Sequence, residues 1–148
     1  MKEIKNILVP IDLSDILSPC VTYGLELARR FGARLHLLYA VHEPGEASGF
    51  STPHVAMDRV HEEAKRRADR QLRLYAASNL GDFSDFVTAV RIGSPHSVIN
   101  QYADKEGIDL IVMGVKRRGR LAQALSQKTT NRVLESSAKP VLRLVISS

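Results

Sequence analysis

The chain has 148 residues, a formal net charge of +5 and one cysteine, which excludes an internal disulfide and a multi-cysteine zinc site. At ~150 residues to a domain, this length predicts a single domain over residues 1–148. No apolar run reaches the ~18 residues of a membrane span, and the N-terminus lacks the pattern of a signal peptide, so we expect a cytoplasmic protein without a membrane partner.

The first third of the sequence predicts a strand, a helix and a second strand. Residues 6–11 are a short apolar run, typical of a buried strand. Helical spacing follows and ends at Gly32, a residue that suits the position after a helix. The start of this helix is open, because either Ser18 followed by proline or Ser14 can be its N-cap. Residues 35–41 are the second apolar run.

The middle of the sequence predicts a loop, a long helix and a third strand. Residues 42–53 are rich in Gly, Pro, Ser and Glu, as loops are. Residues 55–77 are charged and helical in pattern, with Asp69 and Arg73 spaced to pair on the exposed face. Residues 86–92 are a third strand.

The last third continues the alternation. Ser94 and Pro95 predict the N-cap and first position of a helix that ends near Gly107. Three further elements are expected: a strand over 108–113 stopped by Gly114, a helix over 121–137 broken near Gln127, and a strand over 141–146 opened by Pro140.

This alternation predicts the fold class. Short apolar strands that alternate with amphipathic helices indicate an open five-stranded parallel sheet with helices on both faces. Ligands bind such sheets outside the carboxyl ends of the strands, where the strand order reverses. The candidate site residues therefore follow the strands: Asp12, Val41, Gly93 and Gly114.

Asp12 has two interpretations from its position. Its carboxylate follows the first strand and can accept hydrogen bonds from a base or a ribose. With Ser14 two residues on, it can equally cap the following helix.

Positive charge is concentrated near the C-terminus. Residues 1–112 sum to −2, whereas residues 113–148 sum to +7. Such a field attracts an anionic small molecule or an acidic protein partner, although a basic surface can simply keep a protein in solution. Nucleic acid is not expected as a partner, because the chain has four Tyr, four Phe and no Trp with which to stack bases.

Several segments together resemble the universal stress protein family, over nearly the whole chain. The resemblance implies a Rossmann-like α/β fold of the adenine nucleotide alpha hydrolase type. The segments that carry it, in the order in which the family has them, are Ile7-Leu8-Val9-Pro10-Ile11-Asp12, Gly93-Ser94-Pro95, Asp109-Leu110-Ile111-Val112-Met113-Gly114, Val133-Leu134 and Lys139-Pro140-Val141-Leu142.

Many members of this family bind ATP through a loop of the form G-x2-G-x9-G-[ST]. Here Gly114 fits the first position, whereas Arg117, Gln127 and Lys128 stand at the other three. The adenosine contacts of the family fall on Pro10, Asp12, Val41 and Met113, which do fit. The resemblance therefore implies a nucleoside pocket whose phosphate loop is rewritten.

The rewritten loop has two possible consequences. The side chains of Arg117, Gln127 and Lys128 can block the approach of phosphate to backbone N–H groups, which leaves no cofactor. Alternatively, the cations, with Lys116, Arg118 and Arg120, can hold the phosphates of ATP or another adenine nucleotide themselves.

Three other expectations come from the resemblance and the residue types. In the family the last strand commonly pairs across a homodimer, so we expect a homodimer through residues 141–146, which a charge at Leu144 would break. Cys20 lies near a helix start, which can lower a thiol pKa, but a small packing role is the favoured interpretation.

No Ser-His-Asp set or carboxylate pair indicates catalysis, so we expect a regulatory or protective stress-response protein and not an enzyme, slow ATP hydrolysis aside.

Overall fold

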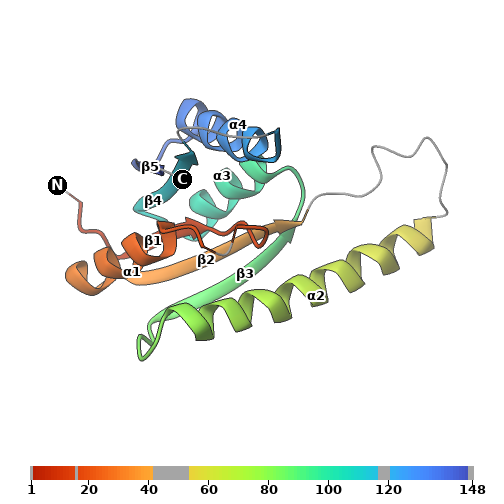
Figure 1. Cartoon of the computed structure of the whole chain (residues 1–148), viewed down its shortest axis with the longest axis horizontal. Coiled ribbons are helices and arrows are strands. Elements are labelled where there is room, and N and C mark those ends of the chain that lie inside the picture. The colour runs from red at the N-terminus through yellow and green to blue at the C-terminus, as the bar shows by residue number, and fades with distance from the viewer. Residues whose placement is uncertain (1, 16, 42–53, 117–120, 147–148) are drawn as a thin grey trace.

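The computed structural model describes residues 2–15, 17–41, 54–116 and 121–146. The predicted loop over 42–53 lies outside this described part. Strands and helices alternate along the chain (Figure 1). The elements are β1 (Asn6–Pro10), α1 (Cys20–Phe31), β2 (Arg34–Val41), α2 (His54–Asn79), β3 (Phe86–Ile92), α3 (Pro95–Lys105), β4 (Leu110–Lys116), α4 (Leu121–Ser136) and β5 (Val141–Ile146).

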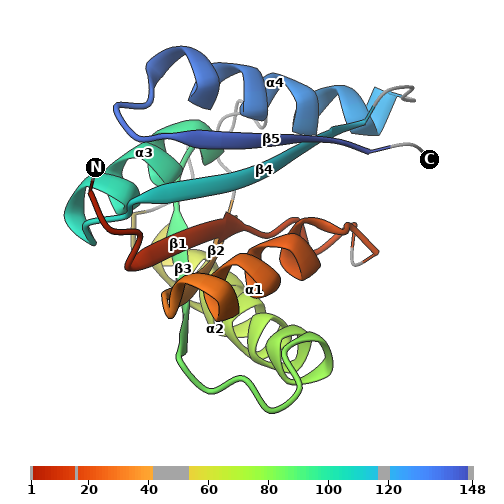
Figure 2. The same ribbon diagram turned by 90° about the vertical axis from the view of Figure 1, so that its left-hand side faces the viewer.

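The strands form one parallel sheet in the order β3-β2-β1-β4-β5, which confirms the predicted fold class. Ile7 in β1 pairs with Leu35 in β2 on one side and with Leu110 in β4 on the other. Helices α1 and α2 lie on one face of the sheet and α3 and α4 on the other (Figure 2). Each face has its own buried cluster, so β1 is covered on both sides, as its near-continuous apolar sequence requires.

The capping signals are partly confirmed. Gly32 adopts φ 63° after α1, a left-handed conformation that a side chain disfavours. Helix α1 begins at Cys20, near the later of the two predicted starts, but its N-cap is Pro19 and not Ser18, and no side chain caps it. Ser18 lies one residue earlier, and its Oγ accepts a hydrogen bond from the Cys20 amide at 3.4 Å. Ser94 stands at the N-cap of α3 as predicted, but its side chain makes no cap bond; its Oγ lies 3.0 Å from His96 Nδ1.

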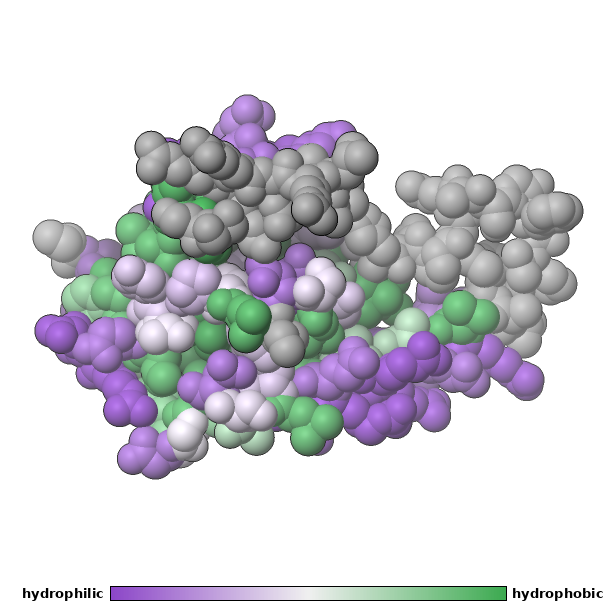
Figure 3. All heavy atoms as spheres, in the orientation of Figure 1, coloured by the Kyte–Doolittle hydropathy of each residue, from purple (hydrophilic) through white to green (hydrophobic). Residues whose placement is uncertain are grey.

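Helix α2 presents one apolar face to the sheet and a charged face to solvent. Its buried side chains recur at helical spacing along one stripe: Ala68, Leu72, Tyr75 and Ala76. On the other face the predicted ion pair between Arg73 Nε and Asp69 Oδ2 forms at 3.1 Å, and Figure 3 shows hydrophilic side chains gathered along this helix. Within the described ranges, no helix combines the length and the apolar character that crossing a bilayer requires.

Two predicted boundaries are wrong. Strand β4 does not stop at Gly114 but runs through it to Lys116, because Gly114 pairs with Leu144 of β5 and neighbouring side chains fill the space that a glycine leaves. Helix α4 is continuous from Leu121 to Ser136, with no break near Gln127.

A polar network lies in the core between the sheet and α3. His36 is 4% exposed; its Nε2 is 2.9 Å from Asn6 Oδ1 and its Nδ1 is 2.8 Å from the Tyr102 hydroxyl. Because an amide oxygen only accepts, Nε2 carries the proton and donates to Asn6, while Tyr102 donates to Nδ1. Arg91 stacks over the Tyr102 ring at 5.6 Å and closes the network on the β3 side.

Burial lowers the pKa of His36, and Arg34 adds to this, whereas Glu106 and Asp85 act in the opposite sense. Below about pH 6.5, the ordinary pKa of histidine, the unfolded chain therefore binds a proton that the folded chain resists. We expect the free energy of unfolding, measured in urea, to fall between about pH 7.5 and pH 5.5.

The variant His36→Gln should lose part of that pH dependence and about 1–3 kcal/mol of stability at neutral pH, since its partners are left imperfectly paired. His96→Gln, in the first turn of α3, is the matched control and should keep the wild-type slope. An unchanged slope in His36→Gln contradicts the assignment.

Candidate functional site: a pocket at the carboxyl ends of the strands

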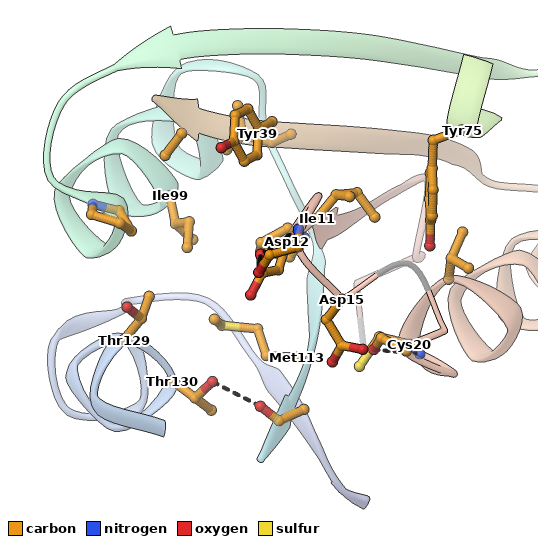
Figure 4. A pocket seen from close by; sticks show the side chains of 18 of the residues that line it. Ile11, Asp12, Asp15, Cys20, Tyr39, Tyr75, Ile99, Met113, Thr129 and Thr130 are labelled. Atoms are coloured by element: carbon orange, nitrogen blue, oxygen red, sulfur yellow. Dashed lines mark hydrogen bonds between the residues drawn. The ribbon is translucent and has the colours of Figure 1, made fainter. Parts of the chain in front are cut away.

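A pocket of about 380 Å³ opens at the carboxyl ends of the strands. It lies where the chain moves from β1 to β2 on one side and the sheet continues through β4 on the other, which is the reversal point of the strand order. The volume is within the ~300–1,000 Å³ usual for small-molecule sites. Figure 4 shows side chains from both sheet faces pointing into it.

The structure brings four of the seven predicted site residues together at this pocket, namely Pro10, Asp12, Met113 and Gly114. Two others stand apart. Val41 is buried, with its carbonyl accepting a hydrogen bond from the Gly93 amide at 2.9 Å, and Lys128 is exposed on α4; neither lines the pocket. Arg117 lies outside the described residues, as do Arg118 and Arg120.

Asp12 does not cap α1, whose N-cap is Pro19. Its Oδ1 accepts hydrogen bonds from the Ser14 amide at 2.9 Å and from the Ser14 hydroxyl, and the Asp15 amide donates to the Asp12 carbonyl. The side chain therefore holds the turn after β1, not the first turn of α1. The same carboxylate lines the pocket, so the turn fixes its position there.

The floor of the pocket is built around Gly114. A Cβ at this position would lie 2.6 Å from Ile146 Cδ1 and 2.8 Å from Cys20 Sγ, closer than real contacts allow. Thr130, from α4, donates a hydrogen bond from its hydroxyl to the Gly114 carbonyl at 3.0 Å (Figure 4). Because Gly114 has no side chain, α1, α4 and β5 can all pack closely against β4 at this position.

Sequence reasoning missed several lining residues. Tyr39 lies on β2 just before its end, Ile146 ends β5, and Pro95 and Ile99 come from α3. Tyr39 and Ile146 could have been predicted, because both lie at or near the carboxyl end of a strand, where ligands bind such sheets. No local signal marks Tyr75, which α2 carries into the pocket from far along the chain.

Among the residues that the structure describes, the titratable groups that line the pocket are acidic or neutral. Its charged lining residues, among those the structure describes, are Asp12 and Asp15. Burial raises the pKa of the Cys20 thiol, opposed by the hydrogen bond with Ser18, so the helix start does not activate it as the alternative interpretation required. Burial, with Cys20 and Asp15 nearby, raises the pKa of Tyr75 to about 12. Burial and Asp12 raise the pKa of Tyr39.

An open five-stranded parallel sheet covered by helices on both faces, with a pocket at the reversal point of its strand order, defines the chain as a doubly wound α/β protein. The model of the universal stress protein family matches residues 3–144. The chain belongs to that family, as the sequence resemblance implied.

Individual relatives agree with this assignment. Universal stress protein G of Escherichia coli O157:H7 is 28% identical over 141 residues, which cover 93% of this chain and 96% of that one. The structure of UspA from Lactobacillus plantarum superimposes with a TM-score of 0.71 at 26% identity, covering 97% and 99% of the two chains. A universal stress protein in complex with cAMP superimposes with a TM-score of 0.61 at 19% identity, covering 97% and 98%.

The packing at Gly114 predicts a specific cost. The variant Gly114→Ala should lower the free energy of unfolding by about 1–3 kcal/mol, because its Cβ overlaps Ile146 and Cys20. Urea unfolding measures the loss. Adding Ile146→Val and Cys20→Ala to Gly114→Ala should recover part of it, whereas a loss that stays unchanged in the triple variant contradicts the overlap.

Proposed function

We propose that this chain is a cytoplasmic, homodimeric stress-response protein of regulatory or protective type. In this proposal it binds an adenine nucleoside and binds ATP weakly or not at all. The observation that carries the proposal is the convergence of Pro10, Asp12, Met113 and Gly114 on one pocket of about 380 Å³. These are the positions at which members of the family contact adenosine.

The pocket chemistry supports a nucleoside. Apolar walls from Ile11, Ile99 and Met113 can accept the faces of a base, while the Asp12 carboxylate and nearby hydroxyls can accept or donate hydrogen bonds to a ribose. The cAMP complex of a similar structure is a further support at the level of ligand class.

The phosphate side of the site supports weak ATP binding. In the family pattern, Gln127 and Lys128 occupy the position of the third glycine and of the hydroxyl residue, and Lys128 is exposed outside the pocket lining. Both positions lie inside α4 (Leu121–Ser136), where backbone N–H groups bond to carbonyls four residues earlier, so these groups are not available to hold a phosphate. The second candidate function is a nucleotide sensor in which the cations of residues 116–120 hold the phosphates instead, as their charge favours.

A binding role, not catalysis, is part of the proposal. The described lining residues include no histidine, lysine or arginine that could act on a phosphate, and Oδ1 of Asp12 is committed to the turn. The cationic C-terminal quarter leaves an anionic small molecule or an acidic protein as the kind of partner we expect.

Calorimetric titration tests the nucleotide part. We expect adenosine to bind wild-type protein and Mg-ATP to bind no more tightly than adenosine. The triple variant Arg117→Gly, Gln127→Gly, Lys128→Ser should gain about tenfold or more in ATP affinity, because glycine disfavours the helix at this point of α4 and so releases backbone N–H groups for a phosphate. Adenosine affinity is the internal control and should not change. Wild-type binding of ATP much tighter than of adenosine, lost in the triple variant, would support the sensor instead.

The edge strand β5 supports the dimer. It pairs with β4 on one side only, and Leu142 and Val145 are 36% and 52% exposed. An apolar edge with unpaired backbone groups favours pairing with a second copy. Leu144, in contrast, is half-buried against the core, so a charge there would test folding as well as association.

Val145→Glu is therefore the sharper variant. Light scattering during gel filtration should give twice the 16.4 kDa chain mass for wild type and the single-chain mass for Val145→Glu, because a buried charge without a partner opposes association. Leu74→Glu, at an exposed position of α2, is the matched control and should stay dimeric. A dimeric Val145→Glu would rule out an interface through this strand.

A further inference from the structure

Strand β5 carries a single charge in an otherwise apolar sequence. Val-Leu-Arg-Leu-Val-Ile is typical of a strand covered on both faces, yet none of its six residues belongs to the buried core. The strand is the outermost one of the sheet, beside β4 (Figure 2). Its charged residue, Arg143, is exposed and takes part in none of the ion pairs among the described residues.

The hydrogen bonds between β4 and β5 determine which backbone groups of β5 face outward. The Ile111 amide donates to the Pro140 carbonyl at 2.9 Å, and Ile111 pairs with Val141 in the parallel ladder. Successive residues of a strand direct their N–H and C=O groups to opposite sides, so alternate residues from Pro140 onward face β4. The backbone groups of Val141, Arg143 and Val145 therefore face the open edge.

A second copy of the chain can pair with this edge in the antiparallel direction, related by a two-fold axis. Every outward-facing residue of β5 finds a partner when Arg143 lies opposite its own counterpart and Val141 lies opposite Val145 of the second copy. A shift of the pairing by two residues in either direction leaves one of these residues without a partner inside the strand. The backbone hydrogen bonds thus favour the register centred on Arg143.

This register places apolar side chains opposite one another everywhere except at its centre. Leu142 lies opposite Leu144 and Val141 opposite Val145, and such pairs stabilise antiparallel strands. At the centre, two arginines lie opposite each other with their Cα atoms about 5.5 Å apart, and like charges so placed oppose pairing. The second copy brings no carboxylate on its own β5, because the strand contains none.

We propose that the two copies of Arg143 form a site for one phosphate-like anion on the two-fold axis of the homodimer, so that the anion holds the two edges together. The inference rests on the homodimer of the proposed function and adds the ligand that joins its halves. A guanidinium binds phosphate through paired N–H donors, and two guanidinium groups can hold opposite sides of one tetrahedral anion. The negative charge of the anion also cancels the repulsion between the arginines.

Sedimentation equilibrium measures the dimer dissociation constant with and without the anion. Wild-type protein is compared in sodium chloride and in inorganic phosphate at equal ionic strength, so general screening is the same. We expect the dimer to be about tenfold tighter in phosphate, because charge-assisted hydrogen bonds to both arginines form only there. Arg143→Gln should dimerise equally well in both salts, and more tightly than wild type in chloride. Arg70→Gln, which removes an exposed arginine of α2, is the matched control and should keep the wild-type difference.

A further arm of the experiment identifies the source of the phosphate group. AMP replaces inorganic phosphate, with adenosine as its control. Tightening by AMP but not by adenosine shows that a phosphate carried by a nucleotide fits the site. Tightening by inorganic phosphate alone assigns the site to the free anion.

Cross-linking tests the register directly. Cys20 is the one cysteine of the chain, so Cys20→Ala gives a background without thiols. In it, Arg143→Cys places two thiols opposite each other, within the Cα separation of about 4.4–6.8 Å that a disulfide needs. Val145→Cys, at an exposed position of the same strand, places its thiols far apart along the two strands. We expect mild oxidation to give a covalent dimer from Arg143→Cys only.

The outcomes separate the anion site from the homodimer itself. If the wild-type dimer is equally tight in chloride, phosphate and AMP, if Arg143→Gln keeps the difference, or if Val145→Cys cross-links and Arg143→Cys does not, the anion site is overturned and the homodimer stands. If wild type stays monomeric in every buffer, the homodimer fails and the site fails with it. A dimeric Arg143→Gln in that case marks Arg143 as a charge that prevents edge pairing.

Discussion

The central position of β1 in the parallel sheet is the constraint on which the rest of the structure depends. Right-handed crossovers carry the chain from β1 outward to β2 and β3, and then back across to β4 and β5 on the other side. Helices α1 and α2 must then cover one face and α3 and α4 the other. This reversal separates the segments that follow β1 and β4, and the pocket is the space left between them.

Close packing at the floor of that space decides its chemistry. Gly114 lets Cys20 and Ile146 meet β4, and Thr130 ties α4 to the same carbonyl. The result is a described lining of apolar side chains, hydroxyls and two carboxylates, although the adjoining stretch of sequence is the most basic of the chain.

Much of the fold was predictable because its determinants are local. Buried strands of a parallel sheet read as short apolar runs, and Gly32 marks a helix end by its backbone freedom. The errors arise where tertiary contacts override a local signal. Gly114 breaks a strand in isolation but not beside Ile146 and Cys20, and α4 continues through a segment that sequence pattern alone suggested was broken.

For the site, the sequence by itself determined that Pro10, Asp12, Met113 and Gly114 stand at strand ends, because parallel strands place their carboxyl ends at one edge of the sheet. It also determined family membership, since the matching segments keep their order along the chain. Only the tertiary structure decided that Val41 turns away, that Cys20 is a buried neutral thiol and that Tyr75 enters the pocket from α2. Those outcomes depend on how helices pack across the sheet, which spacing within one segment does not encode.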